Sequence, residues 1–309
     1  MSRYNIQSRS KRSRLTNRLM WYTIVVMTGG VQMNRLNIFL EHVYEAGAQR
    51  GITLEQALEN ARGCGYTGLE CDLWRLEDGS LRGVLSGCGI TAASVYGHYD
   101  LAHDLPEVSR EKMKRHLETA AEFGAGTILA IPGFFRPEDD REDFFARTCE
   151  QLSVLCGIAV QYGITVTVED FDDVNSPCCD IAGLDRLLSG SEGLRWTFDT
   201  GNFAYVREDP AEAYSRLRKY LAHVHVKDRS RDSSRGMPDG SNAKADISGE
   251  LMYPCECGGG YVGVESLVKQ IVADGYTGGF SAEHFGAADQ LDYMRRSAEN
   301  ITEWLREGT

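Results

Sequence analysis

The segment Tyr162-Gly163-Ile164-Thr165-Val166-Thr167-Val168-Glu169 contains the unit on which this chain is built. A helical pattern over residues 142–162 precedes it, and a short run of β-branched residues follows the glycine. Glycine tolerates the left-handed conformation that closes a helix, so the segment predicts a helix, a glycine turn and a strand. Gly65, Gly124 and Gly275 also stand between a helical pattern and an apolar run, which indicates that the unit is repeated.

Eight short apolar runs follow one another from residue 35 onward, and helical patterns alternate with them. Alternation of this kind is typical of a parallel sheet with helices on its faces. Eight units in roughly 270 residues fit a single-domain (β/α)8 TIM barrel of the α/β class better than a doubly wound sheet. The predicted strands cover residues 35–40, 68–73, 91–96, 126–131, 164–169, 194–199, 221–226 and 279–284, and the predicted helices cover residues 53–62, 111–123, 142–162, 181–188, 210–220 and 266–273.

The charge of the chain limits its partners. The formal net charge is −12, and residues 1–32 carry six basic and no acidic side chains, so removing these six charges from −12 leaves −18 for the rest. A body this acidic repels polyphosphate, so nucleic acid is not an expected partner. The glycine motifs of dinucleotide and P-loop sites are also missing from the sequence.

Residues 1–32 are expected to form a basic, disordered leader, followed by the barrel domain over residues 33–309. The apolar run over residues 19–27 is too short to span a bilayer, so no membrane association is expected. The nine cysteines include no C-x-x-C pair and lie mostly in apolar stretches, which favours reduced thiols and a cytoplasmic protein. Cys255 and Cys257 have no further pair at zinc spacing and are expected in a loop.

Four consecutive predicted strands carry a potential metal ligand at or near their ends. Glu169, Asp199 and Glu283 are carboxylates, and His225 supplies an imidazole. In a parallel barrel these ends meet at one face, where enzymes of this architecture build their site. Three carboxylates and one imidazole suit Mn²⁺, Co²⁺ or Mg²⁺. The sequence therefore predicts one divalent ion, with positions left open for a substrate.

Short motifs surround these residues: Glu169-Asp170-Phe171, Phe198-Asp199-Thr200-Gly201-Asn202, His223-Val224-His225-Val226-Lys227-Asp228 and Ser281-Ala282-Glu283-His284-Phe285. They resemble the strand-end motifs of the xylose isomerase-like TIM barrels, the sugar phosphate isomerase/epimerase superfamily. The resemblance covers about residues 35–306. It does not identify a substrate.

The resemblance implies a single ion held by the four strand-end ligands, with His223 as a buried neighbour. In the epimerase branch the first and last glutamates also transfer protons on opposite faces of the substrate, so the catalytic roles would fall to Glu169 and Glu283. Many members have a histidine where this chain has Asn202. An amide is a poor ligand for a transition metal, so a second ion and a hydride shift between carbons are less expected here.

Four further side chains are expected to contact the substrate, namely Trp74, His98, Asn202 and Lys227. The indole could stack on the apolar face of a sugar, and the imidazole could bind a hydroxyl group. The ammonium could pair with an anionic group of the substrate or with the aspartate that follows it. The polar stretch over residues 229–246 is expected to form a mobile lid.

The leading interpretation is a divalent-metal-dependent isomerase or epimerase that acts on a sugar, keto-polyol or similar small polyhydroxy carbonyl compound through an enediolate. A lyase that dehydrates a keto-inositol would use the same ligands, and the sequence does not separate the two. An AP-endonuclease-like DNA repair enzyme would need three zinc ions and additional histidines, so Asn202 and the acidic charge disfavour it. A catalytically dead barrel would be expected to lack one of the glutamates. The oligomeric state stays open, a homo-oligomer included.

Overall fold

The computed structural model describes residues 35–240 and 242–308. All of these residues belong to one compact unit. The expected leader over residues 1–32 therefore lies outside the described residues. Within the described ranges, no helix has both the length and the apolar character needed to cross a membrane.

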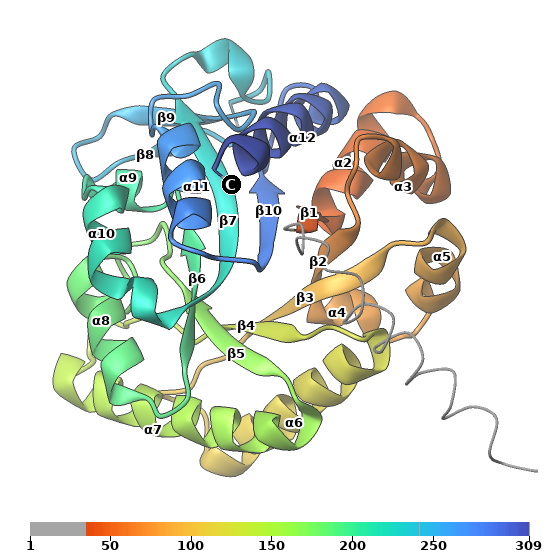
Figure 1. Cartoon of the computed structure of the whole chain (residues 1–309). Helices are drawn as coiled ribbons and strands as arrows, with labels where there is room; N and C mark the ends of the chain where they lie inside the picture. Colours follow the sequence, from red (N-terminus) through yellow and green to blue (C-terminus); the bar gives the residue numbers. More distant parts are fainter. Residues whose placement is uncertain (1–34, 241, 309) are drawn as a thin grey trace, which may run out of the picture. The chain divides into compact units, whose positions relative to one another are not determined.

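Eight parallel strands close into a barrel, and helices surround it (Figure 1). Each strand from β1 to β7 pairs with the next one along the chain, and β10 pairs with both β7 and β1, which closes the ring. This arrangement confirms the predicted (β/α)8 fold. The barrel strands are β1 (Arg35–Phe39), β2 (Gly68–Asp72), β3 (Thr91–His98), β4 (Thr127–Ile131), β5 (Thr165–Glu169), β6 (Arg195–Asp199), β7 (Leu221–Ser230) and β10 (Gly279–Glu283).

All six predicted helices are present, and two long ones were not predicted. Helix α2 begins at Leu40, directly after β1, so the apolar pattern of the strand runs into that of the helix. Helix α12 covers the last part of the chain. The α-helices are α2 (Leu40–Arg50), α3 (Leu54–Gly63), α4 (Leu73–Leu76), α5 (Leu81–Cys88), α6 (Pro106–Phe123), α7 (Arg141–Ala159), α8 (Ile181–Gly190), α9 (Phe203–Val206), α10 (Pro210–Leu217), α11 (Val264–Ala273) and α12 (Gln290–Glu307), and the 3₁₀ turns are η1 (Val160–Tyr162), η2 (Arg218–Tyr220) and η3 (Ser233–Arg235).

Alternation along the strands separates an apolar layer from a polar barrel interior. In β10, Phe280 and Ala282 belong to the apolar core beneath the helices. Ser281 instead donates a hydrogen bond of 2.8 Å to Glu70 of β2, although β1 lies between these two strands. Because successive side chains point to opposite faces, Glu283 lies on the same inner face as Ser281. The alternation of side chains along the strands thus places ionisable groups inside the barrel.

Two similar segments, Gly65-Tyr66-Thr67-Gly68 and Gly275-Tyr276-Thr277-Gly278, introduce β2 and β10. Each tyrosine ties its turn to another element of the barrel. The Tyr66 hydroxyl donates to the carbonyl oxygen of Met294 in α12 at 2.8 Å. The Tyr276 hydroxyl donates to the carbonyl oxygen of Ala222 in β7 at 3.1 Å. The repeated sequence therefore performs a similar anchoring role twice.

Tyr66→Phe is expected to lower the free energy of unfolding by about 1–2 kcal/mol, because it removes a buried hydrogen bond between the β2 turn and α12. Urea denaturation measures the change. Tyr162→Phe is a suitable control, since the Tyr162 hydroxyl makes no hydrogen bond within the described residues and the ring packs at the edge of the core. Equal destabilisation by both substitutions would contradict the assignment.

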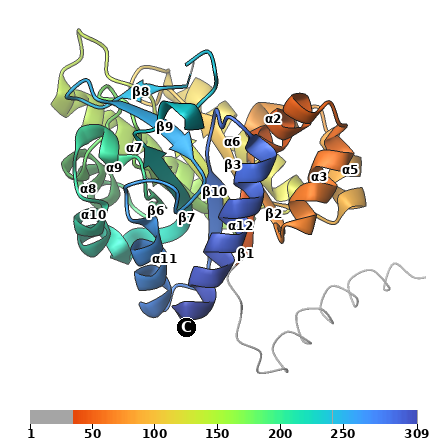
Figure 2. The same cartoon turned by 90° about the horizontal axis from the view of Figure 1, so that it is seen from above.

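The stretch predicted as a mobile lid contains regular structure at both of its ends. Strand β7 continues to Ser230, and its end pairs antiparallel with β9 (Leu251–Cys255), which also pairs with β8 (Lys244–Ala245). Figure 2 shows β8 and β9 at the end of the barrel away from the C-terminus of the chain. The prediction of a loop at Cys255 was wrong, because Cys255 belongs to β9. Strand β9 pairs with the distant end of β7, and local composition does not reveal such a partner.

Candidate metal centre

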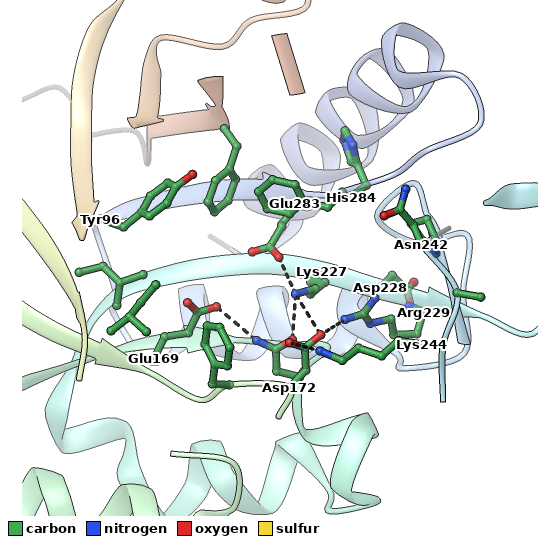
Figure 3. A pocket seen from close by; sticks show the side chains of 18 of the residues that line it. Tyr96, Glu169, Asp172, Lys227, Asp228, Arg229, Asn242, Lys244, Glu283 and His284 are labelled. Carbon is green, nitrogen blue, oxygen red and sulfur yellow. Dashed lines mark hydrogen bonds and ion pairs between the residues drawn. The ribbon is translucent and has the colours of Figure 1, made fainter. Parts of the chain in front are cut away.

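A cavity of about 500 Å³ opens where the barrel strands end. Its lining comes from β1, β3, β4, β5, β7 and β10, and the β8–β9 hairpin contributes Lys244 and Pro254. Figure 3 shows Glu169 and Glu283 reaching toward this space from different strands, with Lys227 between them. The position agrees with the face at which TIM-barrel enzymes place their chemistry.

The four predicted ligands converge beside this cavity. Glu169, Asp199, His225 and Glu283 each offer one ligand atom, and these atoms all lie within 4.8 Å of one another. The Nδ1 atom of His225 is 3.1 Å from Glu169 Oε1 and 3.4 Å from Glu283 Oε2. Side chains from four strands, with up to 58 positions between consecutive ligands (225 to 283), thus form one compact group.

Asp199 is oriented so that one of its oxygens remains available. Its Oδ1 atom accepts hydrogen bonds of 2.8 Å from the backbone N–H groups of Gly201 and Asn202. Its Oδ2 atom is buried and has no hydrogen-bond partner among the described residues. The nearest cationic atom, Lys227 Nζ, is 3.8 Å away, too far for a hydrogen bond, and a bound cation would satisfy this buried oxygen. Together with the oxygen-rich donor set, this oxygen makes the group fit a divalent ion.

The cluster holds three buried carboxyl groups, and burial disfavours their charged forms. Burial raises the pKa of Glu169, an effect that His225 opposes, and burial raises the pKa of Asp199 well above its usual range. Burial also acts on Glu283, but Lys227 and His225 outweigh it and lower the pKa of this carboxyl. One buried ammonium cannot balance three carboxylates, so a bound cation would relieve their repulsion.

Lys227 and Asn202 line the cavity but already connect the two glutamates. The Lys227 ammonium donates to Glu283 Oε1 at 2.5 Å and to Asn202 Oδ1 at 2.8 Å. The Asn202 amide donates to Glu169 Oε1 at 3.3 Å and to the carbonyl oxygen of Asp170 at 2.8 Å. Both residues therefore hold the glutamates in place, and their predicted contact with substrate remains a proposal.

The two other predicted substrate contacts differ in position. His98 lines the cavity and is exposed to solvent. Trp74 is absent from the described lining, and its ring lies 4.0 Å from the Arg75 guanidinium, with the side chain 58% exposed. This geometry does not favour stacking of a sugar on Trp74. The aromatic rings in the cavity wall belong instead to Phe39, Tyr96, Phe171 and Phe285.

Sequence reasoning missed a cationic wall around Asp172. This carboxylate accepts from Arg229 Nη2 at 2.7 Å and from Lys244 Nζ at 2.9 Å, and Lys227 Nζ is 4.0 Å away (Figure 3). Burial would raise the pKa of Asp172, but the three cations outweigh it and lower that pKa. The only available signal was the acidic run after β5, which does not reveal partners from β7 and β8.

Sequence reasoning also missed Glu70, an acid in the middle of β2. It is completely buried, and its Oε1 atom contacts His223 Nε2 and lies 3.6 Å from His225 Nε2. Burial would raise the pKa of Glu70, but the two histidines outweigh it and lower that pKa. Strand alternation could have placed Glu70 inside the barrel, since Leu69 and Cys71 belong to the apolar core.

Comparison with solved structures supports the fold. Similar structures include the probable 3-DHS dehydratase AsbF of Bacillus anthracis, with TM-score 0.66, 15% identity and coverage of 87% of this chain and 98% of that chain. A xylose isomerase-like TIM barrel protein of Mycobacterium smegmatis in complex with magnesium has TM-score 0.63, 20% identity and coverage of 89% and 97%. A D-allulose 3-epimerase of Methylomonas sp. in complex with D-allulose has TM-score 0.64, 15% identity and coverage of 88% and 97%.

Comparison of sequences identifies the family. The rhizopine catabolism protein MocC of Rhizobium meliloti is 25% identical over 272 residues, which cover 80% of this chain and 80% of that protein. The model of the xylose isomerase-like TIM barrel family matches residues 58–307, most of the chain. This match confirms the resemblance seen in the strand-end motifs. The chain belongs to the xylose isomerase-like TIM barrel family.

Proposed function

We propose that this protein is a divalent-metal-dependent isomerase or epimerase of a small polyhydroxy carbonyl compound. The observation that carries the proposal is the convergence of Glu169, Asp199, His225 and Glu283 within 4.8 Å. Their position beside a cavity of about 500 Å³ supports it, because cavities of this size accommodate small molecules. The D-allulose complex of a structural relative favours a sugar-like substrate.

A bound ion would polarise the oxygens next to the reacting carbon and make its C–H group more acidic. Glu283 is assigned as the base, since Lys227 outweighs burial, lowers the pKa of this carboxyl and so favours its ionised form, which can accept a proton. Glu169 is assigned as the acid, since burial raises its pKa and so favours the protonated form, which can donate a proton. One carboxyl removes the proton from carbon, and the other returns a proton to the opposite face of the enediolate. This exchange inverts the configuration at that carbon.

The cavity wall suits a substrate that has both polar and apolar faces. Phe39, Phe171 and Phe285 offer rings for the C–H face of a sugar, and His98 offers a polar group on another side. Arg229 and Lys244 also line the cavity, and both pair with Asp172. Free cysteines at all nine positions agree with a reducing compartment, so we propose a cytoplasmic location.

A substrate panel tests the proposed function. Protein loaded separately with Mn²⁺, Co²⁺ or Mg²⁺ is incubated with ketoses, inososes and their phosphates, and the products are separated by chromatography. We expect isomerised or epimerised product with at least one metal, and no product with the Asp199→Ala variant, which loses the best-oriented ligand. Failure of wild-type protein to bind any of the three ions would contradict the proposal.

A dehydratase is the second candidate, and the similarity to a probable 3-DHS dehydratase favours it. After the same proton abstraction, Glu169 would protonate a leaving hydroxyl group instead of the carbon. The product would then be an unsaturated carbonyl compound and water. Absorbance of this conjugated product in the ultraviolet distinguishes it from an epimer in the same assay.

A further inference from the structure

A second buried layer lies beneath the four candidate ligands, inside the barrel. Glu70 Oε1 accepts a hydrogen bond of 2.8 Å from Ser281 Oγ and contacts Nε2 of His223. His223 Nε2 is also 2.9 Å from Ser281 Oγ. These three residues come from β2, β7 and β10, so the contacts cross the barrel interior. Glu70 therefore contacts side chains from two other strands in this layer.

The His225 ring joins this layer to the ligand cluster. Its Nδ1 atom faces Glu169 and Glu283, whereas its Nε2 atom faces Glu70 Oε1 at 3.6 Å. That distance is too long for a hydrogen bond, and Nε2 has no other hydrogen-bond partner among the described residues. Phe39 packs edge-on against the ring, with a distance of 5.0 Å between the centroids. The ring is thus enclosed, with each nitrogen facing different carboxylates.

We propose that Glu70 is a positioning residue for the metal centre and accepts the Nε2 proton of His225. A neutral imidazole has one N–H donor and one free lone pair, so a proton on Nε2 leaves the Nδ1 lone pair for the ion. Carboxylates that accept from the distal nitrogen of a ligating histidine fix its tautomer and its orientation. A small rotation of the Glu70 carboxylate would shorten the contact. The inference rests on the proposed function, because it requires a metal at Nδ1.

Glu70, His223 and His225 also have the composition of a metal site of their own. Their environment favours the supporting role instead. Glu70 Oε1 already receives the Ser281 hydroxyl and contacts His223, which leaves little access for an ion. None of the described cavity lining comes from Glu70 or His223, so a substrate would not reach an ion held there. These three residues are therefore better explained as support for the four-ligand metal centre above them.

The first test measures the Mn²⁺ affinity of the wild-type full chain and of two variants by calorimetric titration. Glu70→Gln keeps the size of the side chain but removes its charge, and it is expected to weaken Mn²⁺ binding about 10–100-fold. Thr197→Val is the matched control, because Thr197 is equally buried and bonds to Thr167 rather than to Glu70. Its Mn²⁺ affinity should stay within about threefold of wild type, well below the expected effect of Glu70→Gln.

The second test uses wild-type protein alone and does not depend on the folding of a variant. Nitrogen NMR of ¹⁵N-histidine-labelled protein with Zn²⁺ should show His225 bound to the metal through Nδ1 and protonated at Nε2. Metal at Nε2 would overturn the inference, as would wild-type Mn²⁺ affinity in Glu70→Gln. If wild-type protein binds metal and turns over sugar in either case, the proposed function stands and only this inference fails. If wild-type protein binds no metal, both fail.

Discussion

Glu283→Gln is expected to lower kcat about 10²–10⁴-fold, the range in which a single acid or base contributes to proton transfer. The amide cannot accept a proton from carbon, but its oxygen can still face the cluster beside Lys227. Metal affinity should fall less than turnover, because three other ligands remain. Steady-state kinetics at saturating Mn²⁺ separates the loss of chemistry from the loss of metal.

Glu208→Gln provides the control for this substitution. Glu208 is a partly buried glutamate that accepts from the backbone N–H of Ile181, and it lies outside the described lining of the candidate cavity. Its replacement should leave kcat unchanged. A Glu283→Gln enzyme that retains both its metal and most of its turnover would end the assignment of Glu283 as a base.

Removal of the metal is expected to abolish turnover and to destabilise the barrel. Three buried carboxylates within 4.8 Å of one another and of His225 repel each other when no metal ion is bound, because the Lys227 ammonium alone does not balance them. An ion at about 1,000 times its dissociation constant stabilises the folded state by about 4 kcal/mol. At roughly 2–4 °C per kcal/mol, Tm should rise by about 8–16 °C.

Differential scanning calorimetry of chelated protein with and without Mn²⁺ measures this shift. Asp199→Ala should remove most of the shift, since Asp199 offers the oxygen that lacks a hydrogen-bond partner in the cluster. Chelated protein with undiminished turnover and an unchanged Tm would show that the acidic cluster does not serve a metal.

The strands were predictable because each is a short apolar run between turn residues. The unit around Gly163 illustrates this, since η1 ends at this glycine with a φ of 66° and β5 follows it. Helix α2 was missed because it begins directly after β1 without a turn residue. The β8–β9 hairpin was missed because β9 pairs with the distant end of β7, and local sequence does not encode such a pairing.

The candidate ligands were predictable because a parallel barrel brings strand ends together whatever their separation in sequence. Glu169 and Glu283 could be predicted as ligands once their strands were placed correctly. Glu70 was not recognised because it lies within a strand rather than at its end. Asp172 was not recognised because its partners Arg229 and Lys244 reach it only through the hairpin fold.

Solvent deuterium exchange tests the central claim that Glu169 and Glu283 move a proton to and from carbon. The reaction is run in deuterated water with the substrate that the panel identifies, and the product is analysed at low conversion by mass spectrometry and proton NMR. The account predicts deuterium at the carbon next to the carbonyl group, because a carboxyl that has released the substrate's proton takes up deuterium from solvent. Complete retention of the original hydrogen at that carbon, in product and in recovered substrate, would contradict the account and favour transfer of hydride within the substrate.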